Sequence, residues 1–276
     1  MKNVRSRVIA AFVLFFIAGY ASASFTMSMS ITPPSFQKSQ KSAIGIELTN
    51  RGDENAYKGI AAIKYPDSLK ADPIFFEKMA PNTPGKKTEN VTAKSKMLPG
   101  TYPLVVSLQF HDQNNYPIYM IFDSSFVVEK PSASKIYASL SSTEFPLEGF
   151  GTITLKLKNA DDQPHTVKCR LVTPESIQAD RTDDEVEIMP HSEATIEYTI
   201  KNFMALQDSD FLVLAAVEYD DNMHYTTVAR GRVRIGSQAE RPLFYYAAAL
   251  VVVLLLLYWL LRVRDEKQKK YHRKKK

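Results

Sequence analysis

Residues 44–66 read IGIELTNRGDENAYKGIAAIKYP, a stretch in which two strand-favouring runs lie on either side of a turn. The run Ala43–Thr49 is rich in residues that favour strands, and Asn50-Arg51-Gly52-Asp53 follows it as a turn. A second strand-favouring run, Tyr57–Tyr65, ends at Pro66. The pattern predicts two strands joined by a short turn.

The residues around this pair continue the β pattern. From Phe25 to Ile31, apolar and polar residues alternate with the period of 2 that is typical of a strand. No segment of this region has a helical period of 3.6. Four more β-rich runs follow, separated by turn residues: 74–79, 88–93, 102–110 and 118–128. About seven short strands in roughly 105 residues predict an antiparallel sandwich.

The pattern then starts again after a linker at 129–134. The second set of predicted strands is 136–140, 152–158, 166–173, 186–189, 195–201, 211–219 and 225–235. The two halves align at an offset of 108 or 109, so that Leu48-Thr49-Asn50 matches Leu157-Lys158-Asn159 and Pro66-Asp67-Ser68-Leu69 matches Pro174-Glu175-Ser176-Ile177. We interpret this as a tandem duplication that gives two domains, 24–130 and 131–236, arranged as beads on a string.

A charge-free apolar stretch, LFYYAAALVVVLLLLYWLL, runs from Leu243 to Leu261. As a helix it is about 28 Å long, close to the hydrocarbon thickness of a bilayer. Aromatic residues stand near both of its ends, as at membrane interfaces. The stretch predicts one C-terminal transmembrane helix, and a buried core helix is the alternative interpretation.

Residues 1–23 read as a secretory signal peptide. Lys2, Arg5 and Arg7 precede an apolar run, and small residues end it, which predicts cleavage between Ala23 and Ser24. An uncleaved first membrane helix is the alternative. With cleavage, the chain is a type I single-pass protein of the cell membrane, with its bulk extracytoplasmic and its C-terminus cytoplasmic.

The net charge of +5 is unevenly distributed. Residues 1–23 carry +3 and the tail 262–276 carries +7, so the stretch between them is mildly acidic at −5. The basic charge therefore lies outside the predicted domains, and we expect no nucleic-acid partner. In the tail it fixes topology and attracts anionic lipid, or alternatively docks a cytoplasmic partner.

The motifs of catalysis are missing from the sequence. The five histidines are scattered without a zinc spacing, and no Gly-rich phosphate loop is present. Cys169, the single cysteine, alternates with Val167 and Leu171, which predicts a core position rather than a reactive thiol. We therefore expect no enzyme activity, no catalytic residues, no cofactor and no bound metal.

Three features leave a role in binding open. The acidic groups 112–115, 161–162, 183–185 and 220–222 offer oxygen ligands for Ca²⁺, but Asp and Asn are also the usual turn formers. Asn90-Val91-Thr92 is an N-glycosylation sequon, which makes Asn90 a candidate acceptor. The aromatic residues are either partner contacts or core and sheet-face residues: Tyr116, Tyr119, Tyr219 and Tyr225.

Residues 44–66 and their repeat at 154–174 resemble the CARDB-type, immunoglobulin-like modules of bacterial and archaeal envelope proteins. The segment 99–112, which begins PGTYPL, resembles a later part of such modules, and the second half lacks it. The resemblance implies two seven-stranded immunoglobulin-like sandwiches with adhesion, scaffolding or S-layer-type roles.

These features together predict an all-β protein with two tandem sandwiches before the membrane helix. Its expected function is non-enzymatic adhesion or scaffolding of cell-surface components through a protein partner. An accessory subunit of a membrane secretion, transport or oxidase complex is the alternative.

Overall fold

The computed structural model describes residues 26–37 and 39–236 as well as four helical residues, Val252, Leu256, Trp259 and Arg262. Among these residues, no helix is long and apolar enough to cross a membrane. The predicted signal peptide with its cleavage site, and all but these four residues of the predicted span and tail, lie outside the described residues. Both segments therefore stay predictions.

The described region before Gly236 is built of strands. The first half contains β1 (Met27–Thr32), β2 (Ser35–Phe36), β3 (Lys41–Asn50), β4 (Ala56–Tyr65), β5 (Leu69–Ala71), β6 (Ile74–Met79), β7 (Pro84–Ala93), β8 (Gly100–His111) and β9 (Pro117–Val128). The second half contains β10 (Ile136–Leu140), β11 (Thr143–Pro146), β12 (Phe150–Asn159), β13 (His165–Val172), β14 (Ile177–Ala179), β15 (Asp183–Ile188), β16 (Glu193–Asn202), β17 (Asp210–Asp220) and β18 (His224–Gly236).

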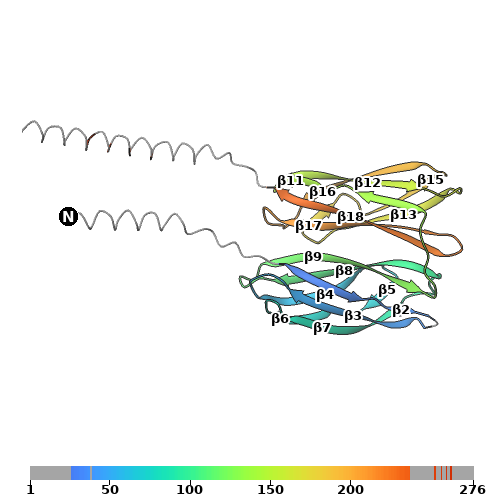
Figure 1. The fold of residues 1–276 in the computed structure, drawn as a ribbon, viewed down its shortest axis with the longest axis horizontal. Helices are drawn as coiled ribbons and strands as arrows, with labels where there is room; N and C mark the ends of the chain where they lie inside the picture. The colour runs from blue at the N-terminus through green and yellow to red at the C-terminus, as the bar shows by residue number, and fades with distance from the viewer. Residues whose placement is uncertain are drawn as a thin grey trace, which may run out of the picture. The chain divides into compact units, whose positions relative to one another are not determined.

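Each half forms a sandwich of two sheets (Figure 1), which we call module 1 (β1–β9) and module 2 (β10–β18). One sheet of module 1 has the order β1-β3-β7-β5, and the other has the order β6-β4-β8-β9-β2. Module 2 repeats both orders as β10-β12-β16-β14 and β15-β13-β17-β18-β11. The second sheets of the two modules join into one ten-stranded sheet, because β18 pairs with β8 at His224 and Gly100. This is the arrangement of immunoglobulin-like sandwiches, in which the first strand pairs with the second and the central strands of the other sheet form a hairpin.

The predicted strand count of seven is wrong, because each module has nine. All seven predicted strands of each half are present, and β6 and β10 have the predicted bounds. The added strands occupy equivalent places in the two modules, because β2 corresponds to β11 and β5 corresponds to β14. They are two to four residues long, too short for an alternating pattern, and they form because a neighbouring strand offers an open edge.

One buried asparagine has the same role in each module. Asn50 and Asn159 are both fully buried, and each is the last residue of the second long strand of its module, β3 or β12. The Asn50 side-chain amide donates hydrogen bonds to the carbonyl oxygens of Glu54 (2.6 Å) and Met79 (3.0 Å). The matching contacts of Asn159 all lie at an offset of 109, which is why this residue pair recurs in the sequence.

The modules are joined more closely than beads on a string, so that expectation is wrong. Both belong to one compact unit that ends at Ile235. Besides a core inside each sandwich, a third cluster lies on the outer faces of the β8-β9 and β13-β17 layers. It consists of Val105, Ile121, Val172 and Leu214, each at most 3% exposed. These strands are therefore covered on both faces.

Candidate functional site

The described residues enclose a groove of about 810 Å³ where the two modules meet. Module 1 contributes residues 65–68, 95–98 and Tyr102, and module 2 contributes Thr166, 168–170, 183–185, 218–220 and His224. The volume lies within the range of ligand sites in proteins. Neither module forms this groove alone, so its shape depends on how the junction is held.

His224 is the central side chain of that junction. Its Nδ1 lies 2.7 Å from Oδ1 of Asp220, and its Nε2 lies 3.0 Å from Oε1 of Glu218. The imidazole stacks on the ring of Tyr102 from module 1, with centroids 3.8 Å apart and planes 5° apart. Since both nitrogens face carboxylate oxygens, the geometry fits the doubly protonated ring.

The electrostatics agree with this geometry. Burial lowers the pKa of His224, but the hydrogen bonds and charges of Glu218 and Asp220 outweigh burial and raise the pKa above its usual value. With both nitrogens engaged, the ring has no free lone pair with which to accept a proton from a substrate. His224 therefore links the modules through its ring, which is held between two carboxylates and Tyr102.

The backbone around His224 ties the linker to both modules. The His224 N–H donates to the Pro99 carbonyl (2.9 Å), and the Ser132 hydroxyl of the linker donates to the His224 carbonyl. The Thr101 N–H donates to the same Ser132 hydroxyl at 3.0 Å. Gly100 has a φ of +154°, and a Cβ there would lie 2.1 Å from the His224 carbonyl oxygen. Only glycine allows this close approach.

Ion pairs and one tyrosine also cross the junction. Arg170 Nη1 lies 2.6 Å from Asp67 Oδ2, and the Arg170 guanidinium also pairs with Asp183. Arg230 pairs with Asp123 through two hydrogen bonds, one of them 3.1 Å long. The Tyr116 hydroxyl donates to the Met204 carbonyl at 2.6 Å. Tyr116 therefore contacts the other module.

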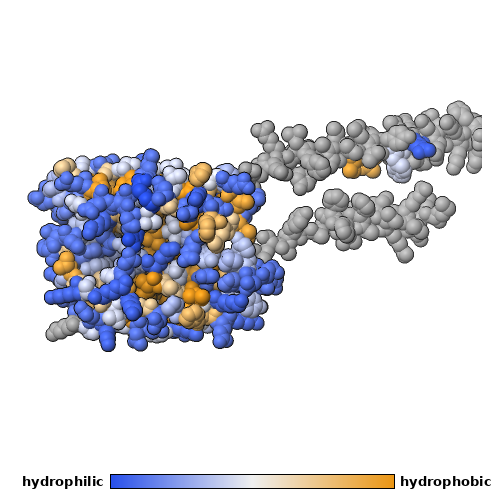
Figure 2. Space-filling model, turned by 180° about the vertical axis from the view of Figure 1, so that it is seen from behind, coloured by the Kyte–Doolittle hydropathy of each residue, from blue (hydrophilic) through white to orange (hydrophobic). Residues whose placement is uncertain are grey.

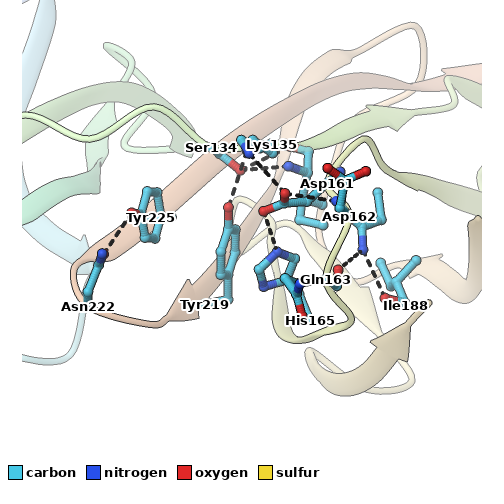
Figure 3. Close-up of polar contacts among 12 residues, drawn as sticks. Ser134, Lys135, Asp161, Asp162, Gln163, His165, Ile188, Tyr219, Asn222 and Tyr225 are labelled. Carbon is cyan, nitrogen blue, oxygen red and sulfur yellow. Dashed lines mark hydrogen bonds and ion pairs between the residues drawn. The ribbon is translucent and has the colours of Figure 1, made fainter. Parts of the chain in front are cut away.

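The remaining predicted tyrosines are sheet and core residues. Figure 3 shows Tyr219 close to Lys135 and His165, and Tyr225 on the other side of Tyr219, near Asn222. The two tyrosine rings stack at 4.9 Å, and the Tyr219 hydroxyl accepts a hydrogen bond from the Lys135 N–H (3.2 Å). Tyr219 is buried, Tyr225 packs against the core, and Tyr119 is half-buried on β9. The core or sheet-face interpretation is confirmed for Tyr219 and Tyr225.

Six of the acidic side chains considered for Ca²⁺ have protein partners. Asp161 binds Lys135 (2.9 Å) and His165 (3.0 Å), as Figure 3 shows. These contacts hold the pKa of Asp161 at about 2. Asp112 accepts two backbone N–H bonds within its own turn. The other pairs are Asp162 with His191, Asp183 with Arg170, Asp184 with Arg181, and Asp220 with His224. In the described part of the chain, no three His, Cys, Asp or Glu side chains are grouped to hold a metal ion.

Cys169 and Asn90 lie in opposite environments. Cys169 is 2% exposed within the core of module 2, which confirms the core interpretation. Burial, with the Asp184 charge, raises the pKa of its thiol to about 12. The Asn90 side chain is exposed on β7, where a glycan would have access, and its modification stays a prediction.

Sequence reasoning missed the junction, although a signal was present. The runs 102–110 and 211–219 are almost continuously apolar, whereas β12 and β16 alternate between buried and exposed residues. A continuous apolar run is typical of a strand that is covered on both faces. The position of His224 in the groove had no comparable signal.

Comparisons with known proteins leave the family open. No family model matches the sequence, and no curated protein matches it either. Many solved structures are weakly similar to the chain, and three of them serve as examples. A protein of unknown function from Porphyromonas gingivalis W83 has 12% identity and a TM-score of 0.29, over 74% of this chain and 98% of that one. Trypsin-activated alpha-2-macroglobulin from Escherichia coli has 12% identity and a TM-score of 0.33, over 78% of this chain and 18% of that one.

The third structure is the periplasmic chaperone SfaE, with 14% identity and a TM-score of 0.31, over 75% of this chain and 100% of that one. These TM-scores are too low to support any argument about family or function. The fold therefore rests on the strand order described above, and the CARDB-type resemblance remains a proposal.

Proposed function

We propose that this protein is a non-enzymatic, single-pass protein of the cell envelope whose two immunoglobulin-like modules bind or scaffold other surface components. In this proposal residues 24–236 are extracytoplasmic, 243–261 span the membrane, and 262–276 are cytoplasmic and attract anionic lipid. The observation that carries the binding role is the groove that only the joined modules create.

The groove's charge favours a basic or polar partner segment. Six carboxylates line it, from Asp67, residues 183–185, Glu218 and Asp220, against the basic side chains of Lys96, Lys168, Arg170 and His224. Several of these groups already pair with each other, so a partner would meet a site with a fixed charge pattern. Charge complementarity between this pattern and a partner would contribute more to the specificity of binding than to its affinity.

Site-specific photocrosslinking in intact cells tests the proposal. A photoreactive residue replaces Lys96, which lines the groove, or Lys86, an exposed lysine on β7 that is outside the groove. We expect a discrete adduct from position 96 and none from position 86. External protease should remove residues 24–236 from the same cells.

Two results would contradict this reasoning. Equal adducts at positions 96 and 86, or none at either, would remove the groove as the binding site. Adducts formed instead from positions within 243–261, with stoichiometric co-purification of membrane subunits, would favour the accessory-subunit role. Protection of 24–236 from external protease would refute the topology.

A further inference from the structure

Exposed apolar side chains concentrate at one end of module 2. Of the eight large hydrophobic side chains that are exposed within the described part of 26–236, four lie there. They are Leu147 (39% exposed), Phe150 (69%), Phe203 (64%) and Leu206 (56%), and we call them the apolar loop patch. The face seen in Figure 2 is largely hydrophilic, with hydrophobic residues in small groups, so this concentration needs an explanation.

The two loops that carry the patch are joined by Asn202. The Asn202 side-chain amide donates to the Leu147 carbonyl (3.2 Å) and to the Ala205 carbonyl (3.1 Å). Its Oδ1 accepts the Ala205 N–H at 2.7 Å. Phe150 and Lys201 are cross-strand neighbours on β12 and β16. The loops 147–150 and 203–206 are therefore held side by side.

The chain leaves module 2 at this same end. The Asp208 N–H donates to the Ile235 carbonyl (2.8 Å), and the Ile235 N–H donates to the Ser209 carbonyl (2.9 Å). The end of β18 therefore contacts Asp208, which is two residues after Leu206 of the patch. Leu243, the first residue of the predicted span, is seven positions after Gly236, and an extended chain covers at most roughly 25 Å over that distance.

We propose that the apolar loop patch contacts the outer leaflet of the membrane in which the chain is anchored, so that module 2 rests on the lipid surface. The proposal rests on the membrane anchor of the proposed function. Aromatic and aliphatic side chains on loops are suited to the boundary between headgroups and acyl chains.

Charge at this end does not favour an electrostatic contact. Exposed Lys201 and Arg234 stand beside exposed Glu148 and Asp208, so the signs are mixed. The contact should therefore depend on the apolar side chains, and it should persist at high salt concentration and in neutral lipid.

The test uses the full chain in vesicles of neutral phosphatidylcholine, with a polarity-sensitive fluorophore on an introduced cysteine. Phe150→Cys and Leu206→Cys place the label in the patch. Tyr137→Cys is the matched control, because Tyr137 is 62% exposed and pairs with Lys158, eight residues from Phe150 along β12 or roughly 26 Å. The buried Cys169 is shielded from the label.

We expect blue-shifted emission and quenching by acyl-brominated lipid at positions 150 and 206, unchanged in high salt, and neither effect at 137. Three results overturn the proposal: no quenching at 150 and 206, equal quenching at 137, or loss of quenching in high salt. If the first occurs while the protein resists carbonate extraction, only the loop contact fails. Release by carbonate would instead remove the anchor and the proposed topology with it.

Discussion

Replacing Asn159 with alanine tests whether the repeated buried asparagine stabilises its module. The Asn159 amide donates to the carbonyl oxygens of Gln163 (2.8 Å), Ile188 (3.0 Å) and Met189 (3.2 Å). Its Oδ1 accepts the Asp161 N–H at 2.8 Å. Asn159→Ala removes all four contacts and leaves buried backbone groups without partners.

The expected loss follows from these contacts. The amide has two N–H groups for its three acceptors, so with the bond that Oδ1 accepts there are three full hydrogen bonds. A net hydrogen bond contributes about 0.5–1.5 kcal/mol, so three give about 1.5–4.5 kcal/mol. The turn lies near the surface, and water would replace part of what is lost, so we expect a decrease of about 2–4 kcal/mol in the free energy of unfolding. Asn50→Ala should have a similar effect in module 1, because Asn50 also accepts the Gly52 N–H (2.9 Å).

Urea unfolding of the fragment 24–236, followed by circular dichroism, measures this loss. Lys158→Ala is the control, because Lys158 is adjacent and its ion pair with Glu193 (3.2 Å) is exposed. That variant should lose less than about 1 kcal/mol. The reasoning would be refuted if Asn159→Ala were no less stable than Lys158→Ala.

Three further predictions concern the junction and the core. Folding raises the pKa of His224, so the contribution of His224 to stability is complete below the unfolded pKa of about 6.5 and is lost as the pH rises through the folded pKa. Urea unfolding at a series of pH values should show this loss of stability, and His224→Gln should make the stability less dependent on pH. Gly100→Ala should cost at least about 2 kcal/mol, since the new Cβ meets the His224 carbonyl at an unfavourable φ; an unchanged urea midpoint would contradict the proposed role of Gly100. Cys169, with a pKa of about 12, should resist iodoacetamide at about pH 8 until urea unfolds the protein; mass spectrometry of labelled native protein checks this.

The long strands and their duplication can be predicted from the sequence. Alternation and turn residues indicate where each long strand lies, because these signals are local. Asn50 and Asn159 recur because a buried turn residue must bond to its own backbone neighbours, which constrains its identity. The four short strands escaped prediction since their formation depends on a partner edge rather than on their own residues.

How the modules join depends on contacts that only the folded chain makes. His224, Tyr102 and Ser132 are far apart in sequence, and they meet where β18 of module 2 pairs with β8 of module 1. The sequence shows that the runs 102–110 and 211–219 are apolar but not which surface covers them. The groove and the apolar loop patch arise in the same way, because they depend on loops that meet only when the strands are placed in space.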